Sequence, residues 1–145
     1  MEWEEFRIRV TELKSSRPLW FELESDARAT EHEIRDAEAS LGVTLPGCYR
    51  KFVREWGGGY FAFGNVFSVE PNSDWNIVRR NRTVCLAGFI SVSDNGTGDY
   101  YGFKVVDGAC GERVYFWDHE EPGSLRETAY VDLFEMLDAI ALRPS

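Results

Sequence analysis

The chain has 145 residues, of which 43% are hydrophobic and 14% are aromatic, a composition that excludes a disordered segment and allows one domain with a hydrophobic core. Sixteen Lys and Arg residues against 25 Asp and Glu residues give a formal charge of −9. This charge disfavours non-specific binding to nucleic acid or to an anionic membrane, and it favours encounter with a basic partner as much as it favours plain solubility.

The first third of the chain is predicted to be helical. Apolar residues recur at helical spacing from Trp3 to Leu13 and indicate an amphipathic helix. The acidic N-terminus lacks the basic and apolar regions of a signal peptide, so no secretory leader is expected. Further on, Thr30 and Glu33 form a capping box that predicts the start of a second helix, and Gly42 suits its end.

A third helix is predicted directly after the second one. Pro46 suits the first turn of a helix, where its missing N–H has no cost. An apolar stripe at positions i, i+3, i+4 and i+7 follows, made of Tyr49, Phe52, Val53 and Trp56. The glycines at 57–59 end the helix.

The remaining chain is predicted to form a sheet and a closing helix. The apolar period changes to two after residue 60, which indicates one or two short strands up to Val69. The run of residues 86–117, with turn sequences at 94–98 and 107–111, reads as a three-stranded antiparallel meander. Asp132 suits the cap of a last helix. We therefore expect an α+β fold, a single domain over residues 1–145 with helices packed on one face of the sheet.

Catalysis and metal binding have little support in the sequence. His32 lies in a charged first helical turn, and His119 lies just past a strand end, but no G-x-S-x-G motif supplies a nucleophile. Acidic residues and His119 at the ends of the meander suggest hard-cation or zinc ligands, yet their spacing matches neither H-E-x-x-H nor an EF-hand loop. A plain turn at 94–98 is the preferred interpretation. We expect no catalytic residue, no metal and no cofactor.

Cysteine and arginine usage point to an intracellular protein without a nucleic-acid site. Cys48, Cys85 and Cys110 are odd in number, widely spaced and typical of reduced thiols. No apolar run reaches the roughly 18 residues of a membrane span. Three arginines, Arg79, Arg80 and Arg82, lie near Trp75 and suggest contact with single-stranded nucleic acid. An exposed face or an internal salt-bridge partner is the preferred alternative. We predict a cytoplasmic protein that binds neither nucleic acid nor membrane directly.

Acidic and aromatic residues gather in the meander. Between positions 94 and 121 there are seven acids against the two bases Lys104 and Arg113. The acids are Asp94, Asp99, Asp107, Glu112, Asp118, Glu120 and Glu121. Tyr100, Tyr115 and Trp117 would share one region of the sheet with them. Aromatic anchors ringed by carboxylates suit the binding of a basic protein, although an ordinary core sheet with an acidic rim has the same composition.

Three segments in this order resemble the signatures of the SUKH superfamily, the Smi–Knr cell-wall-assembly-regulator group. The first runs from Glu33-Ile34 through Leu41-Gly42-Val43 and Leu45-Pro46 to Gly57-Gly58. The second is residues 93–101, SDNGTGDYY, and the third is residues 114–120, VYFWDHE. One departure is visible, because the family commonly has Asn where this chain has Trp56.

The resemblance implies an α+β binding domain without catalytic residues. Many bacterial members are thought to be immunity proteins that neutralise a cognate toxin, frequently one that attacks nucleic acid, whereas eukaryotic relatives act as scaffolds in cell-wall signalling. A basic toxin is thus the predicted partner, and a scaffold for an endogenous protein is the alternative. The expected charged contacts are Asp94, Asp99, Asp118 and Glu120, and the expected anchors are Trp75, Tyr100 and Trp117. A structural role is the alternative for Asp118 and His119.

Overall fold

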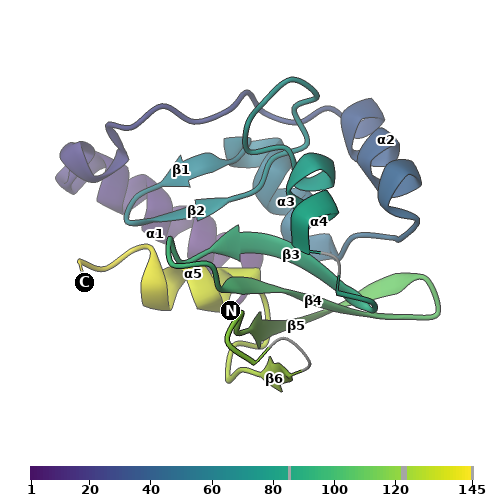
Figure 1. Ribbon diagram of the computed structural model, residues 1–145. Helices are drawn as coiled ribbons and strands as arrows, with labels where there is room; N and C mark the ends of the chain where they lie inside the picture. Colours follow the sequence, from purple (N-terminus) through teal and green to yellow (C-terminus); the bar gives the residue numbers. More distant parts are fainter. Residues whose placement is uncertain (85, 122–123, 145) are drawn as a thin grey trace.

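A computed structural model describes residues 1–84, 86–121 and 124–144 and confirms the α+β class (Figure 1). The first half holds α1 (Trp3–Ser16), the 3-10 helix η1 (Pro18–Phe21), α2 (Glu31–Leu41), α3 (Gly47–Trp56), β1 (Gly59–Phe61), β2 (Gly64–Val66) and α4 (Ile77–Val84). The second half holds β3 (Phe89–Asp94), β4 (Tyr100–Val106), β5 (Ala109–Trp117), β6 (Leu125–Glu127) and α5 (Leu133–Ile140).

The strands form two antiparallel sheets. β1 and β2 form a hairpin, and the larger sheet has the order β3-β4-β5-β6. The predicted meander is therefore confirmed as β3 to β5, with β6 added at its edge. β6 was not predicted because three residues are too few to show an alternating pattern. The two sheets meet where the N–H of Phe67 donates to the carbonyl of Val92, 2.7 Å away, so the hairpin leads directly into the larger sheet.

α2 begins and ends as the sequence predicts. The Thr30 hydroxyl accepts from the N–H of Glu33 at 3.2 Å, and the Glu33 carboxylate accepts from the N–H of Thr30 at 3.0 Å. Gly42 ends the helix with a left-handed φ of +71°. Both ends of this helix are thus set by residues within or next to it.

The start of α3 differs from the sequence prediction. Pro46 is extended, with φ −70° and ψ 154°, and lies just before the helix instead of in its first turn. The Glu112 carboxylate of β5 accepts from the N–H groups of Gly47 and Cys48, at 2.8 and 3.2 Å. Because a distant side chain satisfies these groups, the cap of α3 has no local signature.

α4 was not predicted, since its run of arginines obscured a short helical pattern. The Asn76 side-chain oxygen accepts from the N–H groups of Val78 and Arg79, at 3.0 and 3.1 Å, and so caps the helix. Ile77 and Val84, seven positions apart, are buried. The sequence feature that could have predicted α4 was Asn76 followed by these two apolar residues at positions i and i+7.

One hydrophobic core joins α1, α3, α5 and both sheets. Phe6, Tyr49, Phe52, Phe103 and Leu137 have no exposed surface. Phe6 stacks on Phe134 of α5 with ring centroids 5.0 Å apart, in line with the neighbouring positions of α1 and α5 in Figure 1. Among the described helices, none combines the length and the apolar character that a bilayer span requires.

Two of the three cysteines, Cys48 and Cys110, lie within the described residues. Cys48 is buried and Cys110 is half-buried, and both are free thiols. Burial raises the pKa of Cys110 to about 12 and raises the pKa of Cys48 as well. Both sulfurs are therefore protonated near neutral pH and poor nucleophiles. Cys85 lies outside the described residues.

Candidate functional site

Five aromatic side chains form a continuous line, here called the aromatic row. In order, the row consists of Tyr60, Trp75, Phe67, Tyr100 and Trp117. The successive ring centroids are 5.1, 6.4, 6.5 and 5.9 Å apart. Phe67 is the fully buried member of the row, whereas Tyr60 is 47% exposed and the other three are half-buried. The three anchors predicted from the sequence are thus brought together.

Sheet register and loop hydrogen bonds position these rings. Asp94 of β3, Tyr100 of β4 and Trp117 of β5 face one another across three neighbouring strands. Trp75 lies in the loop before α4, where its carbonyl accepts from the N–H of Ser68 at 2.9 Å and its own N–H donates to the Ser73 hydroxyl at 3.0 Å. The site therefore combines one end of the sheet with the loop before α4.

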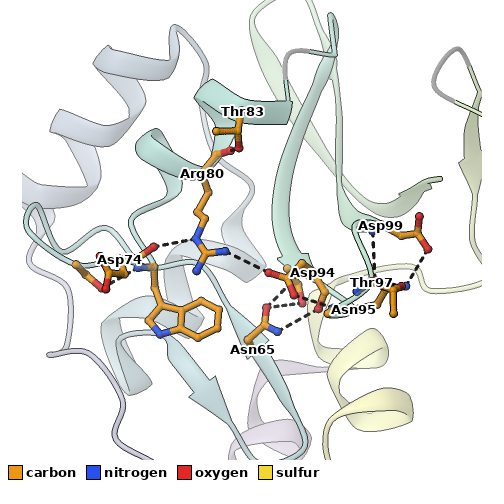
Figure 2. Close-up of polar contacts among 12 residues, drawn as sticks. Asn65, Asp74, Arg80, Thr83, Asp94, Asn95, Thr97 and Asp99 are labelled. Carbon is orange, nitrogen blue, oxygen red and sulfur yellow. Dashed lines mark hydrogen bonds and ion pairs between the residues drawn. The ribbon is translucent and has the colours of Figure 1, made fainter. Parts of the chain in front are cut away.

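Arg80 of α4 ties the aromatic row to this end of the sheet. Its guanidinium lies 4.7 Å from the ring centroid of Trp75 and 5.2 Å from that of Phe67, within cation–π range. It also pairs with the Asp94 carboxylate at 3.3 Å and donates to the carbonyl of Asp74 at 2.8 Å (Figure 2). The preferred reading of the basic cluster as an internal salt-bridge partner is confirmed for Arg80.

Asp94 is held in place on several sides. Besides pairing with Arg80, its carboxylate accepts from the N–H of Gly96 at 2.9 Å. Asn65 of β2 donates to the carbonyl of Asp94 and accepts from its N–H, at 3.0 and 3.1 Å (Figure 2). The residue predicted as a charged contact thus also fixes the turn that follows β3 and joins it to β2.

Asp99, Asp118 and His119 form a cluster next to the aromatic row. The Asp99 carboxylate accepts from the ring Nδ1 of His119 at 2.6 Å and from the side-chain amide of Asn95 at 3.0 Å. Asp118 accepts from the N–H of Glu120 at 2.9 Å. One possible metal-ligand atom from each of the three residues lies within 4.8 Å of the other two, a spacing that would allow all three to bind one cation. Asp99 and His119 are already bonded to each other, and Asp118 is bonded to residues outside the cluster. The expected absence of a metal stays a prediction.

The pairing of Asp99 with His119 shifts both pKa values. Hydrogen bonds from His119 and Asn95 lower the pKa of Asp99 to about 2. The Asp99 carboxylate raises the pKa of His119 above its ordinary value. Because the pKa of Asp99 is lowered on folding, its carboxylate contributes its full stabilisation above the unfolded-state pKa of Asp, near 3.9. Because the pKa of His119 is raised on folding, its imidazolium contributes its full stabilisation below the unfolded-state pKa of His, about 6.5. The contribution of the pair is complete between these limits and falls on either side.

We predict that replacing Asp99 with asparagine lowers the pKa of His119, because the replacement removes the carboxylate that stabilises the imidazolium. The measurement is an NMR pH titration of the imidazole Cε1–H signal in the parent and in Asp99→Asn. The circular dichroism spectrum of the variant, which should match that of the parent, is the control for an intact fold. An unchanged His119 pKa would show that the pair does not form in solution.

Glu120 and Glu121 complete the acidic end of the sheet. Both are exposed, in contrast to the half-buried Asp94, Asp99 and Asp118. Of the four acids predicted as contacts, Glu120 is thus the most open to a partner. From the sequence, Arg80 was selected only as a member of the basic cluster, and Tyr60 and Phe67 were not predicted as site residues, because the alternating pattern after residue 60 indicated only strands.

A comparison with protein-family models matches residues 31–135 to the SUKH model described as SMI1-KNR4 cell-wall. The matched range begins with α2 and contains the aromatic row together with Asp94, Asp99, Asp118 and Glu120. α1 and η1 precede it. A comparison with curated proteins gave no match.

Proposed function

The chain belongs to the SMI1-KNR4 (SUKH) family of protein-binding domains, and we propose that it is an immunity protein that neutralises a cognate toxin by binding and covering it. The toxin is a basic protein that acts on nucleic acid, and the complex forms in the cytoplasm. Neutralisation of the toxin requires binding alone and no catalytic step.

The observation that carries the proposal is the aromatic row beside the acidic end of the sheet. Tyr60, Trp75, Tyr100 and Trp117 offer partly exposed rings, the residue type that dominates binding energy at protein interfaces. The net charge of −9 speeds encounter with a basic surface. Because enzymes that cut or modify nucleic acid need basic clefts, an acidic protein can cover such a cleft.

The seven predicted contact residues then take different roles. Trp75, Tyr100 and Trp117 supply contact area. Glu120 projects its charge toward the partner. The half-buried Asp94, Asp99 and Asp118 shape the turns that present these groups, and they add to the negative field.

The absence of catalysis is supported by the state of the nucleophiles and bases. The ring of His119 is bonded to Asp99, and His32 lies on the exposed face of α2 beside Asp36, at 3.2 Å. The thiols of Cys48 and Cys110 have raised pKa values. Among the described residues, neither imidazole is hydrogen-bonded to a serine, threonine or cysteine side chain, so no pair of nucleophile and base is formed.

The test is titration of the purified protein against the toxin domains encoded in the same genome. One basic toxin domain should lose its activity at a one-to-one ratio. The double variant Tyr100→Ala/Trp117→Ala should bind that toxin at least about 30-fold more weakly, because aromatic anchors at interfaces commonly contribute 2 kcal/mol or more. Calorimetry measures the affinity.

Val106→Ala is the matched control for this double variant. Val106 is also apolar and exposed, but it lies at the opposite end of β4, so its loss should leave affinity unchanged. Thermal unfolding of both variants confirms that they fold. Equal affinity of a folded double variant and the parent would remove the aromatic row from the interface.

Charge reversal separates electrostatic steering from contact. We expect Glu120→Lys/Glu121→Lys to slow association and to weaken its salt dependence, because both side chains are exposed and lie beside the aromatic row. Stopped-flow association at two salt concentrations measures this. Glu4→Lys/Glu5→Lys on α1 is the control with the same change in net charge. If both double variants slow association equally, the net charge of the protein determines the association rate, and Glu120 and Glu121 contribute no more than other surface acids.

A scaffold that binds an endogenous cell-wall or signalling protein is the second candidate, favoured by the cell-wall description of the matching family. A pull-down from the source cells, supplemented with the candidate toxin domains, distinguishes the two. Capture of envelope-assembly or signalling proteins without any toxin domain would favour the scaffold.

A further inference from the structure

A cavity of about 450 Å³ lies where the N-terminal segment meets the rest of the domain, and we call it the seam pocket. One wall comes from α1, η1 and residues 23–28, and the other comes from residues 55–62. Its volume falls within the range of small-ligand sites. Apart from Tyr60, the seam pocket shares no residue with the aromatic row. Its first wall precedes residues 31–135, the range matched by the family model.

The seam pocket is walled by aromatic rings and rimmed by exposed apolar side chains. The rings are Trp20, Phe21, Trp56, Tyr60 and Phe61. Leu23 lines the pocket and is 60% exposed, while the neighbouring Leu19 is 75% exposed. Phe63 is also exposed and packs on Trp20 with centroids 5.0 Å apart. Two of the large exposed apolar side chains, Leu23 and Tyr60, thus line this cavity, and a third, Phe63, packs on a ring of its wall, a gathering that marks a binding site.

Two cations, Lys14 and Arg28, and two carboxylates, Asp26 and Glu55, line the seam pocket beside the rings. The ammonium group of Lys14 lies 5.5 Å from the ring centroid of Phe21, and Arg28 lines the same pocket. Within the described part of the chain, no carboxylate lies within ion-pair distance of either cation. Burial and the nearby charge of Arg28 lower the pKa of Lys14, and the opposing effect of Glu55 is smaller. The Asp26 carboxylate, also in the lining, already accepts from the Ser73 hydroxyl.

We propose that the seam pocket binds an apolar ligand that ends in a carboxylate, either a free arylalkanoate or the C-terminal residue of a peptide. The five rings of the lining receive the apolar body of the ligand, and the polar part of the lining faces its charged end. The carboxylate lies between Lys14 and Arg28, neither of which forms an ion pair with a described residue, and charge-assisted hydrogen bonds from both side chains hold it there. This site is separate from the proposed toxin interface and does not depend on it.

The test compares matched acids and amides. 3-Phenylpropionate is titrated against 3-phenylpropionamide, and N-acetyl-Gly-Gly-Phe against its C-terminal amide. NMR follows the indole N–H signals of Trp20 and Trp56, while those of Trp75 and Trp117 report on the aromatic row. We expect the signals of Trp20 and Trp56 to shift saturably, with each acid binding at least about tenfold more tightly than its amide. Tighter binding of the peptide points to a protein terminus as the natural ligand, and tighter binding of the free acid points to a small molecule.

Two variants test whether Lys14 binds the carboxylate and whether the seam pocket holds the apolar body of the ligand. Lys14→Met leaves Arg28 in place and should reduce the preference for the acid over the amide, whereas Lys51→Met, which removes an exposed lysine of α3 outside the pocket, should keep it unchanged. Thr11→Phe fills the pocket from an exposed position of α1 and should block both ligands without changing a charge. Equal affinity for acid and amide, shifts confined to Trp75 and Trp117, or no saturable shift would each overturn the proposal.

Discussion

Replacing Gly57 with alanine is expected to destabilise the protein by roughly 3–5 kcal/mol, a large fraction of the stability of a domain this size. A Cβ atom at this position would lie 2.0 Å from the carbonyl oxygen of Asp26 and 2.6 Å from that of Ala27. Both obstacles are backbone atoms and cannot rotate away. The φ of +80° adds strain for any residue with a side chain.

Gly42→Ala is the matched control, because Gly42 also ends a helix at positive φ, +71°, but has no atom within 4 Å of the added Cβ. We expect it to cost about 1 kcal/mol, the conformational penalty alone. Urea unfolding of the two variants measures the difference. Similar midpoints would mean that residues 26–27 do not lie against the end of α3.

The reason for this close contact is the path of the chain between η1 and α2. The N–H of Asp26 donates to the carbonyl of Gly58 at 2.8 Å, and the N–H of Ala29 donates to that of Val53 at 2.9 Å. This segment crosses the end of α3 at a point where only glycine leaves room. Gly57 therefore allows the N-terminal segment, which forms one wall of the seam pocket, to pack against the end of α3.

Replacing Phe6 with alanine is expected to cost about 3–5 kcal/mol, the usual effect of deleting a buried phenylalanine ring. Phe6 has no exposed surface, and its ring contacts Trp56, Phe61 and Phe134 with centroids 5.3, 6.2 and 5.0 Å apart. These partners come from α3, β1 and α5. α1 should therefore unfold together with the rest in one transition, as one domain over residues 1–145 requires.

Ile8→Ala provides the comparison, since Ile8 lies on the same helix but is 53% exposed, and its loss should change stability by less than about 1 kcal/mol. Urea unfolding is followed by tryptophan fluorescence and by circular dichroism. If Phe6→Ala melts α1 alone and leaves the main transition at its original midpoint, residues 1–16 are an appendage and not part of the domain.

Much of the fold could be predicted because its signals are local. The capping box of Thr30 and Glu33, the αL glycine at 42 and the alternation in the meander all lie within a few residues of the element they define. α4 and β6 were missed because they are short. The cap of α3 was missed because Glu112 lies 65 residues from Gly47.

The candidate site was predictable only in part, for the same reason. Trp75, Tyr100 and Trp117 could be selected as aromatic residues near acids, but the buried ring of Phe67 that joins Trp75 to Tyr100 comes from the segment just after β2. The hydrogen bonds that hold Asp94 and Asp99 depend on Asn65, Arg80 and His119, which meet only in the folded chain. Residue type and spacing thus identified the region, while tertiary contacts decide which charges face solvent.

The capping of α3 by Glu112 has a consequence for the order of folding. α2 carries its own cap, so its first turn can form and persist for short times in an otherwise unfolded chain. The first turn of α3 lacks such a residue and gains its hydrogen bonds only when β5 arrives. Closing a loop of this length costs entropy before any contact repays it, so late docking of β5 is expected to complete α3. The two adjacent helices are therefore expected to become stable at different times, one early through local bonds and the other together with the sheet.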